Sequence, residues 1–264
     1  MSPVLALADG YSWQIEGGDK FAAEIVSMLS KAMILQSRGG PSRRLLVNTL
    51  PIMNDSRDSG DLNVFVLPFR GDETFLATTL ALVMRPICLD VQSRKGLLVH
   101  GALVERNGLG TILAGPSGVG KTTTSNRLQP PWRSLSDDLT LIVCDHQGRY
   151  WAHPWPTWSR FEDGGPGGSW DVCHAVPLKG IFFLAKAQEN RAVGLGAGEA
   201  ACMLMEVAEQ ASYRFHWLED DAANRLQKFG NACALVKVVP AFILHLSLNG
   251  PLWKEIDLAL GLDD

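Results

Sequence analysis

A glycine-rich segment of eight residues carries the clearest chemical pattern in the sequence. Its spacing fits GxxxxGK[ST] at every fixed position, and it reads Gly115-Pro116-Ser117-Gly118-Val119-Gly120-Lys121-Thr122. Glycines let the backbone curl until successive N–H groups point inward at phosphate oxygens. In such a loop the lysine reaches the β- and γ-phosphates, and the threonine offers its hydroxyl to Mg²⁺. The segment therefore predicts a site for a nucleoside triphosphate with Mg²⁺, and we expect the next residue, Thr123, to line it as well.

The residues on either side of this loop supply the setting that it needs. The apolar run Thr111–Ala114 predicts a strand that leads into the loop, and a short helix is expected from Thr122 to about Leu128. The N-terminal end of a helix carries partial positive charge, which favours a phosphate there. The glycine pattern also arises by chance, but a strand before it and a helix after it distinguish a binding loop from a chance match.

An acidic pair follows soon after the loop. Asp137 and Asp138 lie 16 and 17 residues after Lys121, just before the apolar run Leu139–Val143. Phosphoryl transfer uses one carboxylate to hold the metal ion and often another to accept the proton of the attacking hydroxyl. Two aspartates before a strand are also common in ordinary turns. The position favours the chemical interpretation, because one short helix and a returning strand bring the pair to the end of the sheet that carries the loop.

Together these motifs resemble the HPr kinase family, within the group that shares the phosphoenolpyruvate-carboxykinase type of P-loop fold. The resemblance covers Leu97–Val143 and rests on four blocks, which are His100-Gly101-Ala102-Leu103-Val104, Gly108-Leu109-Gly110, the loop to Thr122, and Ser136-Asp137-Asp138. It implies ATP and Mg²⁺ as cofactors and a serine or threonine hydroxyl as the phosphate acceptor. The chain is most similar to compact kinase-like proteins encoded beside modified peptides, in lasso-peptide or SynChlorMet-type cassettes. The implied acceptor is therefore a precursor peptide.

The resemblance also implies a role for each residue at a matching position. Asp138 would accept the proton of the acceptor hydroxyl, and Asp137 would hold Mg²⁺ together with Thr122. His100 would sit beside the reacting phosphate, although by residue type alone it is as readily a hydrogen-bonded histidine of a strand. The chain departs from the family at Thr123, where HPr kinases usually carry an acid. It also lacks their Leu-Glu-Ile-Arg-Gly run and their C-terminal arginine segment.

Other residues are candidates to complete such a site. Glu162 is the candidate for the missing metal-binding glutamate, and the run Gly164–Gly168 after it is either a mobile lid or a plain surface loop. Arg160 and Arg214 are candidates to place positive charge on the transferred group, although either is more often a structural arginine. Four tryptophans predict either an aromatic wall for a ligand or a small core beneath a loop. They are Trp151, Trp155, Trp158 and Trp170.

The bulk composition describes a folded chain with no general attraction to nucleic acid or to a membrane. Its 264 residues are 46% hydrophobic and 20% charged, and the net charge is −4. Charged residues and proline interrupt the apolar stretches Phe75–Leu89 and Ala232–Leu248, so neither predicts a transmembrane helix. The five cysteines are widely spaced without a CxxC pair, and the N-terminus has no signal-peptide pattern. We therefore expect free thiols and a cytoplasmic protein.

The elements that must position these residues form an α/β pattern. Residues 1–90 predict a small α+β subdomain with a helix capped by Asp19 and a second helix that ends or kinks at Pro86. Residues 91–264 predict a P-loop kinase domain of the HPr kinase type on a mixed sheet, with a hairpin turned by Asn107-Gly108. The expected strands are Val4–Leu7, Tyr11–Ile15, Leu45–Val47, Leu62–Leu67, Leu97–Val104, Thr111–Ala114, Leu139–Val143, Tyr150–Ala152, Leu178–Leu184 and one within Val236–Leu248. The expected helices are Phe21–Met33, Glu73–Met84, Thr122–Leu128, Gly198–Ser212 and Asp220–Phe229, with a long loop over His153–Ser169.

The sequence thus predicts an ATP- and Mg²⁺-dependent kinase acting on a serine or threonine of a peptide or small protein. Two other functions remain open at this point. One is a kinase for the hydroxyl of a small metabolite, and the other is a nucleotide-dependent binding module that helps other enzymes engage a peptide. No nucleic-acid or membrane partner is expected, and the sequence is compatible with an oligomer.

Overall fold

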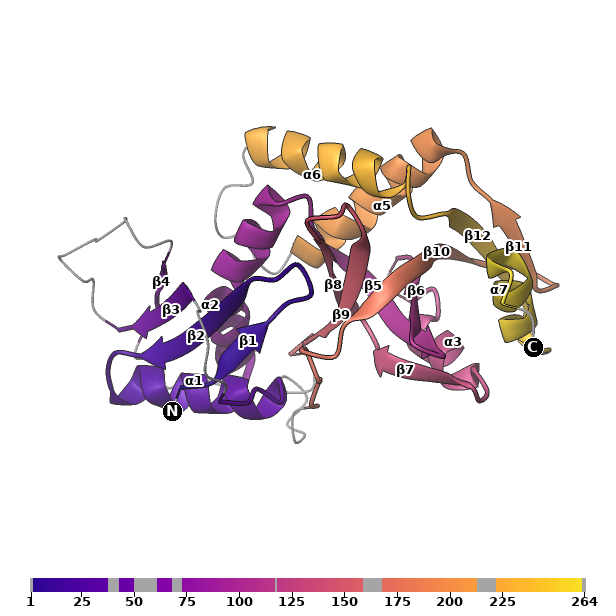
Figure 1. Cartoon of the computed structure of the whole chain (residues 1–264). Helices are drawn as coiled ribbons and strands as arrows, with labels where there is room; N and C mark the ends of the chain where they lie inside the picture. The colour runs from indigo at the N-terminus through magenta and orange to yellow at the C-terminus, as the bar shows by residue number, and fades with distance from the viewer. Residues whose placement is uncertain are drawn as a thin grey trace.

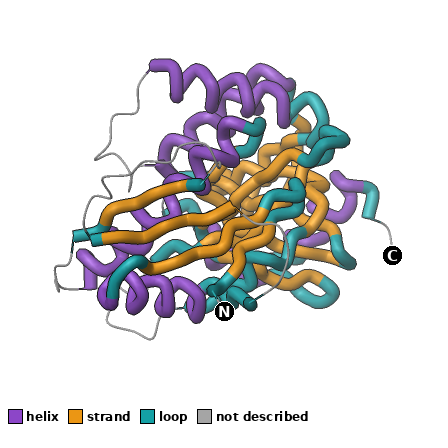
Figure 2. Tube along the Cα trace, turned by 60° about the vertical axis from the view of Figure 1, so that its left-hand side comes forward, coloured by secondary structure: helices purple, strands orange, loops and turns teal. Residues whose placement is uncertain are grey.

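A computed structural model describes the chain at residues 2–37, 43–49, 61–67, 73–116, 118–158, 168–212 and 222–262. Within these residues the fold is α/β with two sheets that mix parallel and antiparallel strands, as expected (Figures 1 and 2). The elements are β1 (Val4–Ala6), β2 (Ser12–Gly17), α1 (Lys20–Ala32), β3 (Arg43–Asn48), β4 (Leu62–Phe65), α2 (Glu73–Ser93), β5 (Leu97–Arg106), β6 (Leu109–Ala114), α3 (Lys121–Arg127), β7 (Trp132–Ser136), β8 (Leu139–Cys144), β9 (Tyr150–Trp155), β10 (Val176–Lys186), β11 (Arg191–Gly194), α5 (Ala197–Ser212), α6 (Ala222–Leu235), β12 (Ala241–Leu246) and α7 (Leu252–Leu260).

The first sheet is built by the N-terminal residues in the order β1-β2-β3-β4. The predicted hairpin is present as the antiparallel pair β1–β2, and β2, β3 and β4 are parallel. The predicted cap is also present, since one carboxylate oxygen of Asp19 accepts the backbone N–H of Ala22 at 3.0 Å. Its other oxygen accepts the backbone N–H and the hydroxyl of Thr49 at 3.0 and 2.7 Å. One side chain thus begins α1 and ties the end of β3 beside it.

Helix α2 is longer than predicted, because it continues through Pro86 to Ser93 instead of ending there. Proline removes a helical hydrogen bond and costs about 3 kcal/mol in a helix interior. The buried stripe of α2 continues on both sides of it, at Leu80, Met84, Ile87 and Val91. Each such side chain gains about 1.5–3 kcal/mol on burial, so packing outweighs the proline.

Packing also explains why α2 is so apolar. Among the described residues it is the helix that is long and apolar enough to cross a membrane, over Phe75–Ser93. Half of that stretch is buried inside the protein, where it joins the core beneath the first sheet. A buried core helix has the same composition, so this length and composition alone are weak grounds for a membrane span.

The second sheet has eight strands and carries the glycine-rich loop. Its order is β11-β12-β10-β6-β5-β8-β9, and β7 also pairs with β5. Strands β12, β10 and β6 are parallel, whereas β5 is antiparallel to β6, β7 and β8. One face is covered by α5, with α6 packed on α5, and α7 packs on buried side chains of the opposite face (Figure 1). The mixed order places β5 at the centre, with neighbours from distant parts of the chain.

Three elements of this part were missing from the sequence prediction. Strand β7 is short and largely polar, and β11 is an exposed edge strand, so neither has an alternating pattern of apolar residues. Helix α7 does have a helical period in Leu252, Ile256 and Leu260, which are its buried residues, and the prediction overlooked it. The loop expected over His153–Ser169 is shorter than predicted, because β9 continues to Trp155.

One hydrophobic cluster joins the two sheets. Side chains of α1 and α2 pack with Leu139 and Leu141 of β8 and with three of the tryptophans in question. Trp155, Trp158 and Trp170 are between 1% and 5% exposed, and the rings of the last two meet edge to face at 6.1 Å. These indoles therefore form a core and not a ligand wall. The division at residues 90 and 91 stays a prediction.

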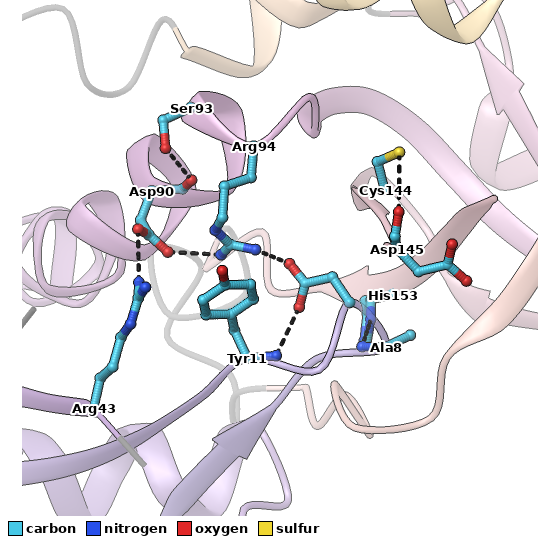
Figure 3. Close-up of polar contacts among 10 residues, drawn as sticks. Ala8, Tyr11, Arg43, Asp90, Ser93, Arg94, Cys144, Asp145 and His153 are labelled. Atoms are coloured by element: carbon cyan, nitrogen blue, oxygen red, sulfur yellow. Dashed lines mark hydrogen bonds and ion pairs between the residues drawn. The ribbon is translucent and has the colours of Figure 1, made fainter. Parts of the chain in front are cut away.

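Polar contacts link the N-terminal hairpin to the second sheet (Figure 3). Arg94 at the end of α2 pairs with Asp9 and Asp90, and its guanidinium lies 3.8 Å from the centre of the Tyr11 ring. His153 of β9 is fully buried, and its Nε2 accepts the backbone N–H of Ala8 at 3.1 Å. These contacts hold the turn between β1 and β2 against the end of α2 and against β9. All five cysteines are free, as expected.

Candidate functional site

The glycine-rich loop has the backbone that phosphate binding needs. Strand β6 ends at Ala114, α3 begins at Lys121, and the loop between them bends at three glycines with positive φ. The φ angles are 152° at Gly115, 77° at Gly118 and 111° at Gly120. A Cβ atom at Gly118 or Gly120 would meet nothing within 4 Å, so no side chain of the described residues packs against the loop at these two positions. This open curve of backbone next to a helix N-terminus fits a chain of phosphates.

Lys121 is the first residue of α3 and turns back into the loop. Its side chain is 5% exposed, and Nζ donates to the carbonyl oxygens of Gly115 at 3.0 Å and Pro116 at 3.4 Å. Nζ also lies 3.6 Å from Oδ1 of Asp138. Burial lowers the pKa of Lys121 from its ordinary value, and the negative charge of Asp138 opposes that shift. The ammonium thus lies where it can reach a phosphate in the loop.

The strand register explains why the histidine and the acidic pair meet this loop. His100 of β5 pairs with Leu139 of β8, and the next residue, Gly101, pairs with Ala114 at the end of β6. Strand β5 therefore carries His100 to the edge from which the loop leaves. Asp138 directly precedes Leu139 in the chain, so the same register brings it beside His100.

The turn that holds the acidic pair is fastened to β5. Ser136 donates its hydroxyl to the carbonyl of Leu139 at 2.8 Å and accepts the backbone N–H of Leu103 at 3.2 Å. Thr140 donates to the carbonyl of Gly101 at 2.9 Å. These hydrogen bonds close the backbone around Asp137 and Asp138, so the pair is presented by a fixed turn between β7 and β8.

His100, Lys121 and Asp138 form one polar cluster. Nε2 of His100 lies 2.8 Å from Oδ1 of Asp138, and Nδ1 lies 3.0 Å from Oε1 of Gln210 at the end of α5. Burial raises the pKa of Asp138, but the hydrogen bond and charge of His100 and the charge of Lys121 outweigh it, so that pKa is lowered overall. The carboxyl group is thus ionised at neutral pH. Its side chain remains 40% exposed and open to a reactant.

Not every predicted site residue joins this cluster. Asp137 is half-buried on the same turn, and within the described residues it makes no hydrogen bond or ion pair with His100 or Lys121. Thr122 and Thr123 are exposed in the first turn of α3. Their predicted roles toward Mg²⁺ and nucleotide stay predictions. Ser117, Glu162, Arg160 and Arg214 lie outside the described residues.

The loop and the acidic turn beside it hold oxygen atoms that could bind a metal ion shared with phosphate. No group of three or more His, Cys, Asp or Glu side chains that could hold a metal occurs in the described ranges. Mg²⁺ is commonly held by one or two carboxylates together with substrate phosphates and water. The exposed hydroxyl of Thr122 and the acidic turn beside the loop supply oxygen ligands of that kind.

Gln210 was missed by the sequence analysis. It contacts His100 across 110 residues of chain, and no spacing pattern marks such a partner. The sequence does place it on a predicted helix, but the face of that helix that meets β5 depends on tertiary packing.

Comparison with known proteins gives one family. No curated protein matches the chain. Among solved structures, the Hpr(Ser) kinase/phosphatase from Coxiella burnetii matches with a TM-score of 0.29 and 9% identity, covering 61% of this chain and 93% of that one. A family model described as SynChlorMet cassette protein ScmC matches residues 66–261, which is most of the chain and includes the loop, His100, the acidic turn and Gln210. The chain therefore belongs to the family of the SynChlorMet cassette protein ScmC.

Proposed function

We propose that this protein is a Mg²⁺-dependent kinase that transfers the γ-phosphoryl group of ATP to a serine or threonine hydroxyl of a peptide. The observation that carries the proposal is the position of Asp138. Its ionised carboxylate lies 3.6 Å from the lysine of the phosphate-binding loop and is hydrogen-bonded to His100. A loop alone supports nucleotide binding, whereas a carboxylate at the end of the loop also supports activation of a hydroxyl.

At the nucleotide end, the backbone of the loop and Lys121 bind the phosphates. Lys121 exchanges its bonds to the carbonyls of Gly115 and Pro116 for phosphate oxygens. Thr122 and Asp137 are the proposed ligands of Mg²⁺, and Glu162 is a third candidate. The ion, when bound, draws negative charge from the transferring phosphoryl group.

At the acceptor end, Asp138 takes the proton of the hydroxyl. The O–H bond breaks as the hydroxyl oxygen forms its bond to the γ-phosphorus, and the bond from that phosphorus to the bridging oxygen of ADP breaks. His100 holds the carboxylate in place at 2.8 Å, and Lys121 offsets negative charge on the leaving phosphates. Proximity and charge thus supply most of the catalysis, as is usual for phosphoryl transfer.

The proposed acceptor is a precursor peptide. This rests on the resemblance of Leu97–Val143 to hydroxyl-phosphorylating kinases and on the cassette named in the family description. A peptide encoded in the same cassette is therefore the first acceptor to test. A cytoplasmic location follows from the same proposal, because ATP is the phosphate donor.

Incubation with γ-labelled ATP and Mg²⁺ tests the function and its alternatives. The acceptors are the cassette peptide, the same peptide with every Ser and Thr changed to Ala, and free serine. The proposal expects label on the first peptide alone. Label on free serine but not on the peptide would indicate a metabolite kinase. Peptide binding that depends on ATP without any transfer would indicate a binding module.

A further inference from the structure

Gln210 lies on the opposite side of His100 from Asp138. Helix α5 packs on β5 and brings the amide oxygen of Gln210 to 3.0 Å from Nδ1, while Oδ1 of Asp138 lies 2.8 Å from Nε2. The histidine side chain is only 15% exposed. Both ring nitrogens are thus held by protein groups, and the ring cannot turn without losing two hydrogen bonds.

The orientation of the Gln210 amide is set by Glu206, one helical turn earlier. Nε2 of Gln210 donates to Oε1 of Glu206 at 3.3 Å. A carboxylate only accepts hydrogen bonds, so the NH₂ group of the amide must face Glu206 and its carbonyl oxygen must face His100. The reversed amide would place its oxygen against the carboxylate of Glu206. Residues four apart on a helix are neighbours, which makes this pair a local property of α5.

The protons of His100 follow from these partners. Nδ1 faces a carbonyl oxygen, which only accepts, and therefore carries a hydrogen. Nε2 lies 2.8 Å from Oδ1 of Asp138, and a carboxylate oxygen accepts, so this short contact is made by a hydrogen on Nε2. With an acceptor on each side, the ring donates from both nitrogens. Gln210 is thus the group that keeps a hydrogen on Nδ1 of His100.

We propose that Gln210, oriented by Glu206, is a positioning residue that makes His100 a donor on both sides and thereby fixes Asp138. Both contacts of Asp138 within the described residues, to His100 and to Lys121, are made by Oδ1. Oδ2 is the oxygen left for the acceptor hydroxyl. Gln210 itself touches neither nucleotide nor acceptor in this scheme. The proposal rests on the kinase function, in which Asp138 accepts the proton.

Nitrogen NMR of the full chain with ¹⁵N-labelled histidine tests the positioning without any activity. The signals of His100 are identified by their loss in His100→Gln. In the wild type we expect a hydrogen on Nδ1, the ring nitrogen that faces the amide oxygen of Gln210. Gln210→Leu removes the acceptor at Nδ1 and should take the hydrogen from that nitrogen, whereas Gln210→Glu keeps an acceptor there and should keep the hydrogen. Glu206→Ala lets the amide turn and gives a mixture of the two states.

A matched control is available on the same helix. Glu209 is the neighbour of Gln210 and pairs with Arg225 at 3.1 Å, at the surface. Glu209→Gln changes α5 without touching His100, so its spectrum should match the wild type. Ring signals of His100 that are the same in the wild type, Gln210→Leu and Glu206→Ala would overturn the proposal, and Glu206→Ala keeps this test available if Gln210→Leu fails to fold.

Kinase assays provide the second measurement. Gln210→Leu should lower kcat by about tenfold, as loss of an outer partner of a functional histidine commonly does, and leave the KM for ATP unchanged, because the loop is intact. Gln210→Glu should recover most of the rate. Loss of rate in Gln210→Leu that Gln210→Glu does not recover would contradict the positioning role. If no variant transfers phosphate but the ring protons depend on Gln210, the kinase function fails and the positioning of His100 remains.

Discussion

Lys121 and Asp138 each carry a charge whose burial is offset by the other. Burial lowers the pKa of the lysine and the carboxylate opposes this, while His100 and the lysine keep the pKa of the carboxyl group low against its own burial. The two charges lie 3.6 Å apart, close enough to attract and too far for a direct hydrogen bond of normal length. The pair therefore remains available to partners that arrive from solution.

Replacing Lys121 tests whether this residue binds the nucleotide. Lys121→Met keeps the apolar stem but removes the charge, so the affinity for Mg²⁺-ATP should fall by about tenfold to a hundredfold, as expected for one charge-assisted hydrogen bond. Titration calorimetry measures the affinity. Lys179→Met, at an exposed position of β10, is the control and should bind ATP like the wild type. Equal affinities for both variants would exclude Lys121 from the nucleotide site.

The β5–β6 hairpin and the loop after it form the element that carries the site. Strand β5 brings His100 and strand β6 brings the loop, and their register aligns the two at one edge of the sheet. Gly108 turns the hairpin with a φ of 79°, and Gly120 begins α3 with a φ of 111°. Both glycines have open space where a Cβ would be. The same change to alanine can therefore be made in the hairpin turn and in the loop.

Alanine at Gly120 and at Gly108, in separate variants, shows whether ATP binding depends on the loop and not on the hairpin turn. Both residues have positive φ, so each alanine costs about 1–2 kcal/mol of stability through backbone strain. In Gly120→Ala the strain also falls on backbone that directs its N–H groups at phosphate, so ATP binding should weaken by at least about tenfold. In Gly108→Ala binding should be unchanged. Thermal unfolding and calorimetry measure the two effects, and equal loss of affinity in both variants would argue against a phosphate-binding loop.

The β5–β6 hairpin and the loop after it could be predicted from the sequence, because the motifs that mark them are local. The Asn107-Gly108 turn, the loop glycines and Asp138 all stand within one stretch of chain, and their spacing follows from backbone geometry. Gln210 could not be predicted, because its contact with His100 depends on how α5 packs. The predicted helix end before Pro86 was wrong for a related reason, since local propensity favoured an end there and the buried stripe of α2 overrode it.

At the scale of the whole molecule, His153 connects the second sheet to the turn that follows β1 of the first sheet. It is fully buried in β9 and donates from Nδ1 to the carbonyl of Val172 at 2.7 Å. Its Nε2 accepts the backbone N–H of Ala8 at 3.1 Å (Figure 3). Burial lowers the pKa of His153 to about 4, while the nearby charge of Asp9 opposes the shift and that of His174 adds to it. A proton on Nε2 would remove the acceptor for Ala8, so only the neutral ring fits.

Stability should therefore depend on pH in a defined window. The pKa in the unfolded chain is about 6.5 and the folded pKa is about 4, so the unfolded state binds the extra proton between these values. The free energy of unfolding should fall by up to about 3 kcal/mol as the pH drops through this window. His153→Gln keeps a donor and an acceptor but does not titrate, and chemical denaturation should give it a flatter profile. His245→Gln is the control, and a profile as flat as that of His153→Gln would contradict the assignment.

Phosphate transfer by Asp138→Asn is the most direct test of the central claim. The amide keeps the shape of the side chain but cannot accept the proton of a hydroxyl, so transfer from γ-labelled ATP to the cassette peptide should fall by at least about a hundredfold. ATP binding should persist, because Lys121 and the loop are intact. Asp171→Asn, at an exposed position outside the site, should transfer phosphate like the wild type. Transfer by Asp138→Asn at the wild-type rate would contradict the account.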